Sequence, residues 1–132
     1  MDETETLAIV IPAFEEARNL RDLLTRVRSA LAGVAVNWEV IVVDDDSRDG
    51  TEQIVREMCG EEARLRLLIR RGERGLSGAI LHGWRHTDAR ILGVMDADGQ
   101  HPPEALPSLI AAFGNGSDMA IASRYAPGSC GG

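Results

Sequence analysis

Acidic side chains gather at three places in the sequence, and each place directly follows a short apolar run. Residues 15–16 (Glu-Glu) come after the first run, residues 44–46 (Asp-Asp-Asp) after the second, and residues 96–98 (Asp-Ala-Asp) after a later one. Carboxylates that converge repel one another, so such clusters need a partner of opposite charge. A hard divalent cation, Mg²⁺ or Mn²⁺, takes oxygen ligands, and two carboxylates one residue apart can hold it together with a diphosphate. The spacing of Asp96 and Asp98 therefore predicts a metal site.

The apolar runs have the length of buried strands, and segments with helical spacing of leucine, isoleucine and valine lie between them. The predicted strands span residues 7–11, 40–43, 65–69, 91–95 and 119–122, and the predicted helices span residues 15–31, 51–58, 76–86 and 103–113. This alternation is typical of an α/β fold, a Rossmann-like, mostly parallel sheet flanked by helices. A length of 132 residues fits a single domain, residues 1–132.

The strand ends decide where the chemistry should lie. In an open parallel sheet, ligands bind beyond the carboxyl ends of the strands. The three acidic clusters follow such ends, and so does Arg124 after the last predicted strand. We therefore expect these side chains to meet along one edge of the sheet.

The composition excludes several classes of protein. The formal net charge is −7 and aromatic residues make up 4% of the chain, so binding to a nucleic-acid backbone or to stacked bases is not expected. Every basic residue is arginine, and without lysine the chain can form neither a Schiff base nor a Walker A phosphate loop. No apolar run approaches the roughly 18 residues of a membrane span, and we expect a cytoplasmic protein.

Three other patterns indicate different chemistry and are weaker. Residues 45–50 resemble the start of an EF-hand calcium loop, but its twelfth position is Arg56 instead of glutamate. Residues 75–79 resemble the nucleophile elbow of a hydrolase around Ser77, but the last glycine is replaced by alanine. His82 and His86 are spaced to share a metal, but the glutamate of an H-E-x-x-H motif is absent, and two histidines on a helix surface are the better interpretation.

Four motifs, in order, resemble those of the family 2 glycosyltransferases. Residues 11–20 (IPAFEEARNL) resemble the opening I-P-x-Y-N-E-x-x-N-L, and residues 42–51 (VVDDDSRDGT) resemble V-V-D-D-x-S-x-D-G-T. Residues 95–104 (MDADGQHPPE) and 122–125 (ASRY) are similar to the branch that makes polyprenyl-phosphate sugars, which includes dolichyl-phosphate mannosyltransferase. Within these motifs, phenylalanine stands at position 14 where the family has tyrosine, and glutamate at position 15 where it has asparagine.

The resemblance implies a GT-A type nucleotide-binding half and an inverting transfer of a sugar from a nucleotide donor to a lipid phosphate. By motif position, the donor nucleotide would contact Pro12, Phe14, Glu16, Val43, Asp45, Asp96, Ala97 and Asp98. Asp98 would be the catalytic residue, and it would hold Mg²⁺ or Mn²⁺ together with Asp96 and Gln100. Arg124 would bind a phosphate.

Donor, acceptor and location follow from the same resemblance. GDP-mannose is the favoured donor and a polyprenyl or dolichyl phosphate the acceptor, with peripheral contact at the cytoplasmic face of a membrane. Family members continue beyond the fourth motif, so we expect the chain to be truncated on its acceptor side. The alternative function is a nucleotide-binding module without transferase activity.

Overall fold

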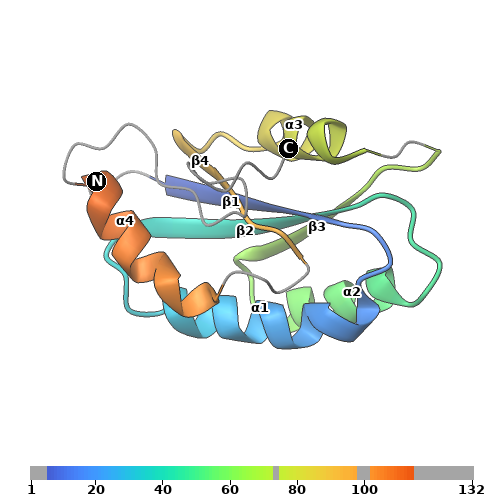
Figure 1. Ribbon diagram of the computed structural model, residues 1–132, viewed down its shortest axis with the longest axis horizontal. Helices are drawn as coiled ribbons and strands as arrows, with labels where there is room; N and C mark the ends of the chain where they lie inside the picture. The colour runs from blue at the N-terminus through green and yellow to red at the C-terminus, as the bar shows by residue number, and fades with distance from the viewer. Residues whose placement is uncertain (1–5, 73–74, 98–101, 115–132) are drawn as a thin grey trace.

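The computed structural model describes residues 6–72, 75–97 and 102–114, and it confirms the predicted α/β fold. Four parallel strands form one sheet in the order β3-β2-β1-β4. Helices α1, α2 and α4 lie against one face of the sheet, and α3 covers the other (Figure 1). The elements are β1 (Thr6–Ala13), α1 (Ala17–Leu31), β2 (Asn37–Asp44), α2 (Thr51–Glu61), β3 (Leu65–Ile69), α3 (Leu76–Arg85), β4 (Ile91–Val94), the 3₁₀ turn η1 (Pro103–Ala105) and α4 (Leu106–Gly114).

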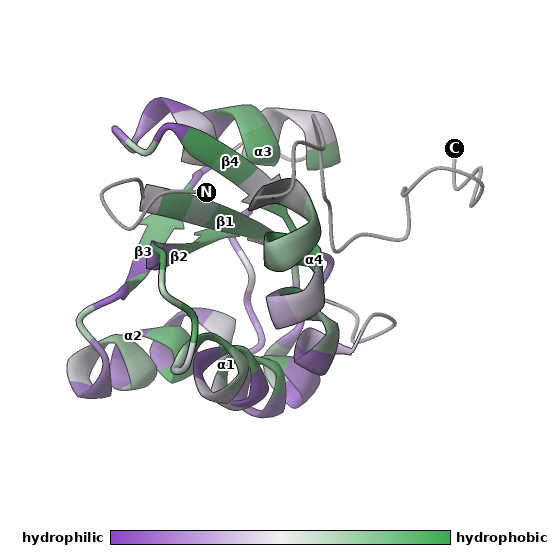
Figure 2. Ribbon diagram, turned by 90° about the vertical axis from the view of Figure 1, so that its left-hand side faces the viewer, coloured by the Kyte–Doolittle hydropathy of each residue, from purple (hydrophilic) through white to green (hydrophobic). Residues whose placement is uncertain are grey.

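The sheet separates two hydrophobic cores of different size. Alternate residues of a strand point to opposite faces, so Leu7, Ile9 and Ile11 of β1 join the larger core under α1 and α2. Helix α1 contributes five buried residues to that core, spaced so that they lie on one side of the helix: Leu20, Leu23, Leu24, Val27 and Leu31. Figure 2 shows the apolar sides of α1 and α2 turned toward the sheet and their polar sides turned away.

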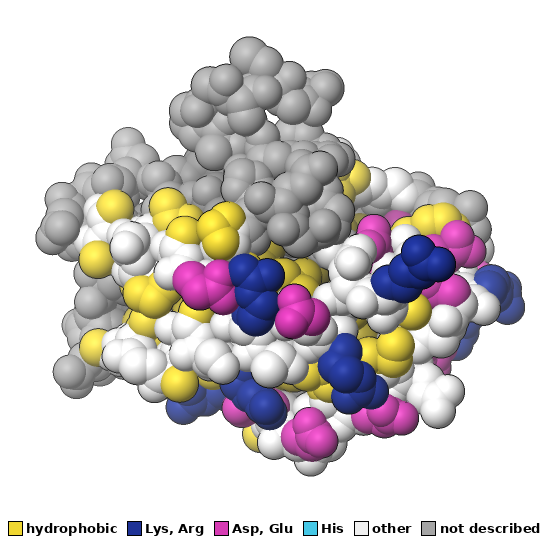
Figure 3. Space-filling model, turned by 60° about the horizontal axis from the view of Figure 1, so that its bottom comes forward, with side chains coloured by type: hydrophobic (Ala, Val, Ile, Leu, Met, Phe, Trp, Pro, Cys, Tyr) yellow, Lys and Arg dark blue, Asp and Glu magenta, His cyan; other side chains and the backbone are white. Residues whose placement is uncertain are grey.

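Ion pairs cover the outer face of the helical layer. Arg21 of α1 pairs with Glu57 of α2 at 2.8 Å, and Arg26 of α1 pairs with Glu104 of η1. Arginine and acidic side chains alternate over this face in Figure 3. Exposed pairs of this kind contribute little to stability, about 0–1 kcal/mol each, so the apolar core carries the packing of this layer. Among the residues described, no helix combines the length and the apolarity needed to cross a bilayer.

Strand β1 continues through Pro12 to Ala13, although the predicted strand stopped at residue 11, just before the proline. The carbonyl of Val10 accepts a hydrogen bond from Met95 on the β4 side, and the carbonyl of Ala13 accepts one from Asp45 on the β2 side. Because successive residues turn their backbone groups to opposite sides, Pro12 faces the β4 side, beyond Val94 where β4 ends. The missing N–H of Pro12 therefore breaks no ladder hydrogen bond.

Other boundaries moved by one to a few residues. Helix α2 continues through Gly60 to Glu61, because a glycine near a helix end costs only about 1 kcal/mol and does not stop the helix. The predicted helix over 103–113 divides into the turn η1 and helix α4. The predicted strand over 119–122 lies outside the described residues.

Helix α3 packs unusually close to the sheet, and glycine makes this possible. A Cβ atom at Gly83 would lie 2.7 Å from Cγ2 and 2.9 Å from Cγ1 of Val10. Ala79, also buried, faces the same small core. Small side chains on α3 thus let the helix lie directly over β1 and β2.

We expect Gly83→Ala to lower the free energy of unfolding by about 1–3 kcal/mol, because the added methyl overlaps Val10 in a packed core. Urea denaturation measures the change. Gly60→Ala is the matched control, since nothing lies within 4 Å of its Cβ position and alanine favours the helix. Equal stability of the two variants would contradict the close packing of α3.

Candidate functional site

Loops from the carboxyl ends of all four strands meet along one edge of the sheet. They comprise residues 14–16 after β1, 45–50 after β2, 70–72 after β3 and 95–97 after β4. Backbone hydrogen bonds join neighbouring loops: Asp45 N–H donates to Ala13 at 3.0 Å, and Arg70 N–H donates to Asp44 at 2.9 Å. The acidic residues that follow β1, β2 and β4 are therefore gathered at the edge where the sequence placed them.

A pocket of about 270 Å³ opens at this edge. It is lined by Pro12, Ala13, Phe14, Asp45, Gly75 and Leu76. Three of these, Pro12, Phe14 and Asp45, were predicted to contact a donor nucleotide, and the structure brings them together. Gly75 and Leu76, at the start of α3, were not predicted as site residues.

Asp45 supplies the polar side chain among the described residues of this pocket, and that side chain is 6% exposed. Its Oδ2 accepts a hydrogen bond from the backbone N–H of Gly75 at 3.0 Å. Within the described residues its Oδ1 accepts no hydrogen bond, although the atom is buried. Asp45 Oδ1 thus keeps the capacity to accept a hydrogen bond, as do Asp44 Oδ2 and Asp96 Oδ2.

Arg70 supplies the positive charge beside Asp45. Its guanidinium Nη1 lies 3.4 Å from Oδ1 and 3.5 Å from Oδ2 of Asp45, and the side chain is 9% exposed. Sequence analysis missed this residue because it considered the acidic strand ends and passed over the end of β3. The available signal was its position directly after the apolar run of residues 65–69.

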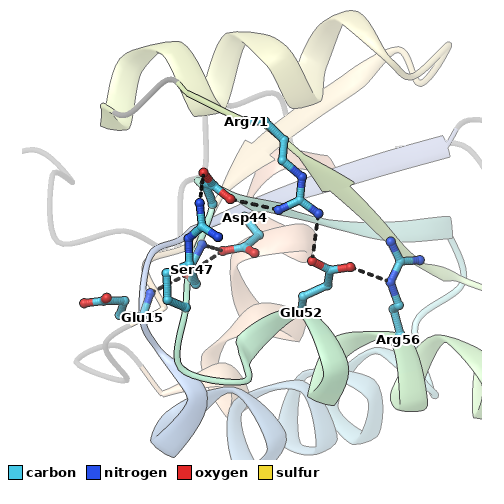
Figure 4. A network of polar contacts seen from close by, with 8 residues as sticks. Glu15, Asp44, Ser47, Glu52, Arg56 and Arg71 are labelled. Carbon is cyan, nitrogen blue, oxygen red and sulfur yellow. Dashed lines mark hydrogen bonds and ion pairs between the residues drawn. The ribbon is translucent and has the colours of Figure 1, made fainter.

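Arginine also balances the outer part of the second acidic cluster. Arg71 donates to Asp46 at 2.8 Å and to Glu52 at 3.1 Å, and Arg56 donates to Glu52 at 3.0 Å (Figure 4). The hydrogen bond from Arg71 lowers the pKa of Asp46, and the hydrogen bonds from Arg56 and Arg71 lower the pKa of Glu52. For Asp45 and Asp46, arginine therefore supplies the partner of opposite charge that the sequence predicted for this cluster.

Asp44 has a different role from its two neighbours. It is fully buried, and its Oδ1 accepts hydrogen bonds from the backbone N–H and the hydroxyl of Ser47. Burial raises the pKa of the Asp44 carboxyl, and the two hydrogen bonds from Ser47 oppose that rise. The Ser47 hydroxyl in turn accepts from the backbone N–H of Glu15 at 2.6 Å (Figure 4). Asp44 and Ser47 thus fasten the loop after β1 to the loop after β2.

Two non-glycine residues of these loops have left-handed backbones, Glu15 with φ 53° and Asp46 with φ 64°. Such a conformation is uncommon outside glycine and persists only where the surroundings hold it. Ser47 holds Glu15 through its backbone, and Arg71 holds Asp46 through its side chain. The strain is therefore located in the two loops that border the pocket.

Asp49 joins the first turns of α1 and α2. Its Oδ2 accepts from the backbone N–H of Ala17 at 3.2 Å, and its Oδ1 accepts from the backbone N–H and the hydroxyl of Thr51. Thr51 completes the link by accepting from the backbone N–H of Glu16. Burial acts to raise the pKa of Asp49, but the hydrogen bonds from Thr51 and Ala17 bring it below its ordinary value.

Replacing Asp49 with asparagine is expected to lower the free energy of unfolding by about 1 kcal/mol at pH 7, because one oxygen acceptor is lost. The pKa of Asp49 is lower in the folded chain. The stabilisation is therefore present above the ordinary pKa and is lost as pH falls through the folded value. Urea denaturation at pH 7 and about pH 3 should show the difference from wild type shrinking in acid. Asp22→Asn, at a side chain 75% exposed, is the control. A difference that persists unchanged in acid would contradict this role for Asp49.

The remaining predicted residues fall in three groups. Val43 is fully buried in the small core under α3, and Glu16 directly precedes α1, where its Oε2 accepts from Asn19 at 3.0 Å. Asp96 and Ala97 follow β4 and Met95 at the carboxyl edge, both more than nine-tenths buried. Asp98, Gln100 and Arg124 lie outside the described residues.

The predicted metal site is therefore described in part. Asp96 places one hard carboxylate donor at the edge where the cation was expected, which fits the chemistry of Mg²⁺ or Mn²⁺. In the described part of the chain, no three His, Cys, Asp or Glu side chains come close enough together to hold a metal ion. The other two predicted donors, Asp98 and Gln100, follow Ala97 in the sequence.

The weaker patterns do not form sites of their own. Asp45 and Asp49 bind different backbone groups instead of converging as a calcium loop requires. Ser77 is exposed in the first turn of α3. The ring of His86 stacks near that of His82, with centroids 4.4 Å apart, and its Nδ1 lies 2.7 Å from the His82 carbonyl oxygen. These contacts agree with two histidines on a helix surface.

The parallel sheet with helices on both faces has the GT-A architecture of glycosyltransferases. Its architecture is similar to that of a mannosyltransferase from Pyrobaculum calidifontis solved with GDP-Man and Mn²⁺, with a TM-score of 0.66 and 26% identity over 83% of this chain and 33% of that one. The profile of the family described as Glycosyl transferase family 2 matches residues 8–132, and the chain belongs to this family.

Two relatives have the same name. A dolichol-phosphate mannosyltransferase from Mycosarcoma maydis is 41% identical over 129 residues, which are 95% of this chain and 44% of that protein. The dolichol-phosphate mannosyltransferase from Pyrococcus furiosus is 43% identical over 122 residues, 92% of this chain and 34% of that protein. The chain thus spans less than half the length of these relatives.

Proposed function

We propose that the chain is the donor-binding part of a glycosyltransferase that moves mannose from GDP-mannose to a polyprenyl or dolichyl phosphate. The observation that carries this proposal is the pocket lined by Phe14 and Asp45, whose Oδ1 forms an ion pair with Arg70 but accepts no hydrogen bond within the described residues. The names of the two mannosyltransferase relatives support mannose as the sugar. The GDP-Man complex of the similar structure supports GDP as the carrier.

The pocket has the chemistry that a guanine base requires. Among the lining residues, Phe14 offers an apolar ring and Asp45 offers a carboxylate oxygen. Guanine carries ring and exocyclic N–H groups on one edge, and a carboxylate accepts hydrogen bonds from such groups strongly. Adenine presents a ring nitrogen acceptor at the same place, which Asp45 would repel.

The diphosphate of the donor belongs next to β4. Asp96, Asp98 and Gln100 would hold a Mg²⁺ or Mn²⁺ ion there, and the ion would neutralise the charge that develops on the leaving diphosphate. Arg124 would contact a phosphate oxygen. The chain's own residues thus bind the base at one side of β1 and the phosphates at the other, which orients the sugar between them.

The acceptor needs little activation. A phosphate monoester is already anionic, so its oxygen can attack the sugar carbon without a general base. Attack opposite the departing diphosphate inverts the configuration at that carbon. Because such an acceptor is a lipid, we place the protein peripherally at the cytoplasmic face of a membrane.

Transfer is tested by incubating the chain with labelled GDP-mannose, Mn²⁺ and a short polyprenyl phosphate, and measuring label in the organic phase. We expect labelled lipid to accumulate, and base treatment of the lipid to release mannose phosphate. Nucleotide binding without labelled lipid would favour the alternative, a binding module without transferase activity. A serine-directed acylating probe should leave Ser77 unlabelled.

A further inference from the structure

Arg70 is a buried cation to which neither the motifs nor the proposed reaction gives a role. Its guanidinium lies beside Asp45 and also donates to the carbonyl of Gly75 at 3.3 Å. The first turn of α3 covers it: a Cβ atom at Gly78 would lie 2.8 Å from Nη2 and 2.9 Å from Nη1 of Arg70. The guanidinium therefore occupies a closely fitted space between β2, β3 and α3.

Asp45 and Gly75, two partners of Arg70, line the pocket, while Arg70 itself is not among the described lining residues. Asp45 and Gly75 are also joined directly, through the Gly75 N–H and Asp45 Oδ2. Gly75 has a φ of 137°, a backbone conformation that side chains rarely adopt. The three contacts among Arg70, Asp45 and Gly75 thus fix the orientation of the Asp45 carboxylate. They also fix the position of Gly75, the residue directly before α3.

A buried charge of this kind is stable only while its partners stay in place. An arginine can serve both partners, because its planar fork carries several donors in a fixed geometry. A lysine ammonium is a single centre on a flexible stem, so it can pair with Asp45 but cannot reproduce the geometry that also serves Gly75. The site therefore requires arginine, and positive charge alone does not satisfy it.

We propose that Arg70 is a positioning residue of the donor-base pocket, which holds Asp45 and Gly75 in the orientation that accepts the base. The proposal rests on the proposed function, because it assumes that the pocket binds a nucleobase. It assigns Arg70 an effect on base recognition and none on the diphosphate, which belongs to the β4 side of the site.

Two variants disturb Arg70 by independent routes. Arg70→Lys removes the fork, and Gly78→Ala places a methyl group where the guanidinium lies while leaving Arg70 in the chain. Gly60→Ala is the control, as another helical glycine with nothing near its Cβ position. Calorimetry of the full chain measures the affinities for GDP, ADP and pyrophosphate, each with Mn²⁺, and thermal unfolding measures the stability of every variant.

In both Arg70→Lys and Gly78→Ala we expect GDP affinity to fall about tenfold, as one well-oriented charge-assisted hydrogen bond is lost. The preference for GDP over ADP should fall with it, while pyrophosphate affinity stays within about twofold of wild type. A general loss of structure would instead weaken pyrophosphate equally and lower the unfolding temperature, and that result would overturn the proposal.

The remaining outcomes separate this proposal from the proposed function. Unchanged GDP affinity and base preference in both variants, with GDP bound by wild type, would overturn the role of Arg70 and leave the donor site in place. Binding of pyrophosphate but of neither nucleotide by wild type would overturn the base pocket and the Arg70 proposal with it. If Arg70→Lys does not fold, Gly78→Ala decides alone.

Discussion

Asp45→Asn is expected to weaken GDP binding by about 100-fold, the largest effect of any change in the pocket, because a charged acceptor is replaced by a neutral group. The side-chain amide of the variant has one favourable orientation. Gly75 N–H donates to Oδ2, so the amide oxygen takes that place and the amide nitrogen takes the place of Oδ1, which lies 3.4 Å from Arg70 Nη1. The amide NH₂ group then faces the pocket, where it meets the N–H groups of guanine as one donor against another.

Calorimetric titration of GDP measures this effect, and thermal unfolding shows whether the variant remains folded. The matched control is Asp46→Asn, one residue along the same loop. Asp46 pairs with Arg71 outside the pocket, and asparagine tolerates its left-handed backbone. We expect the control to bind GDP within about threefold of wild type. Loss of affinity in the control but not in Asp45→Asn would mean that the wrong carboxylate has been assigned to the base.

The second large effect is expected at the phosphate side of the site. Asp98→Ala should abolish the part of donor binding that depends on Mn²⁺, because it removes a carboxylate from a site built on two of them. In wild type, Mn²⁺ should strengthen GDP binding by at least about tenfold, and in the variant the affinities with and without Mn²⁺ should be the same.

Asp88→Ala is the control for that experiment. Asp88 is exposed and precedes β4, at the edge of the sheet opposite to the candidate site. Its removal changes the net charge by the same amount as Asp98→Ala, so any unspecific effect of charge appears in both. Undiminished dependence on Mn²⁺ in Asp98→Ala would contradict the assignment of the metal to the residues after β4.

Much of the fold follows from local patterns in the sequence. The run of residues 65–69 is β3 to the residue, because a short apolar segment between charged residues has few other ways to be buried. The start of α2 at Thr51 was also predicted, and the structure adds the cause, the hydrogen bonds from Thr51 to Asp49. Pro12 misled the prediction because its tolerance depends on where the neighbouring strand ends, which is a property of the sheet.

The site was harder to predict, because three identical side chains have three different roles. Asp44 braces a loop, Asp45 faces the pocket and Asp46 pairs with Arg71. The alternation of a strand would place residues 44 and 46 on one side, but the left-handed backbone at Asp46 breaks that rule. The family motif therefore locates the loop, and only the packing assigns each carboxylate.

Arg70 and Gly75 are site residues that the sequence patterns did not identify. Neither belongs to an acidic cluster, yet both contact Asp45. Their contribution depends on the distance between the end of β3 and the start of α3, which follows from how closely α3 packs on the sheet. Gly78 and Gly83 permit that packing, and a sequence pattern does not indicate what lies opposite a glycine.

The central claim, that this edge of the sheet is a donor-nucleotide site, is tested most directly by calorimetric titration of GDP, UDP and GDP-mannose into the chain, each with and without Mn²⁺. We expect GDP and GDP-mannose to bind more tightly than UDP, and Mn²⁺ to strengthen both. Failure of all three to bind, in a sample whose circular dichroism shows the folded α/β domain, would contradict the account.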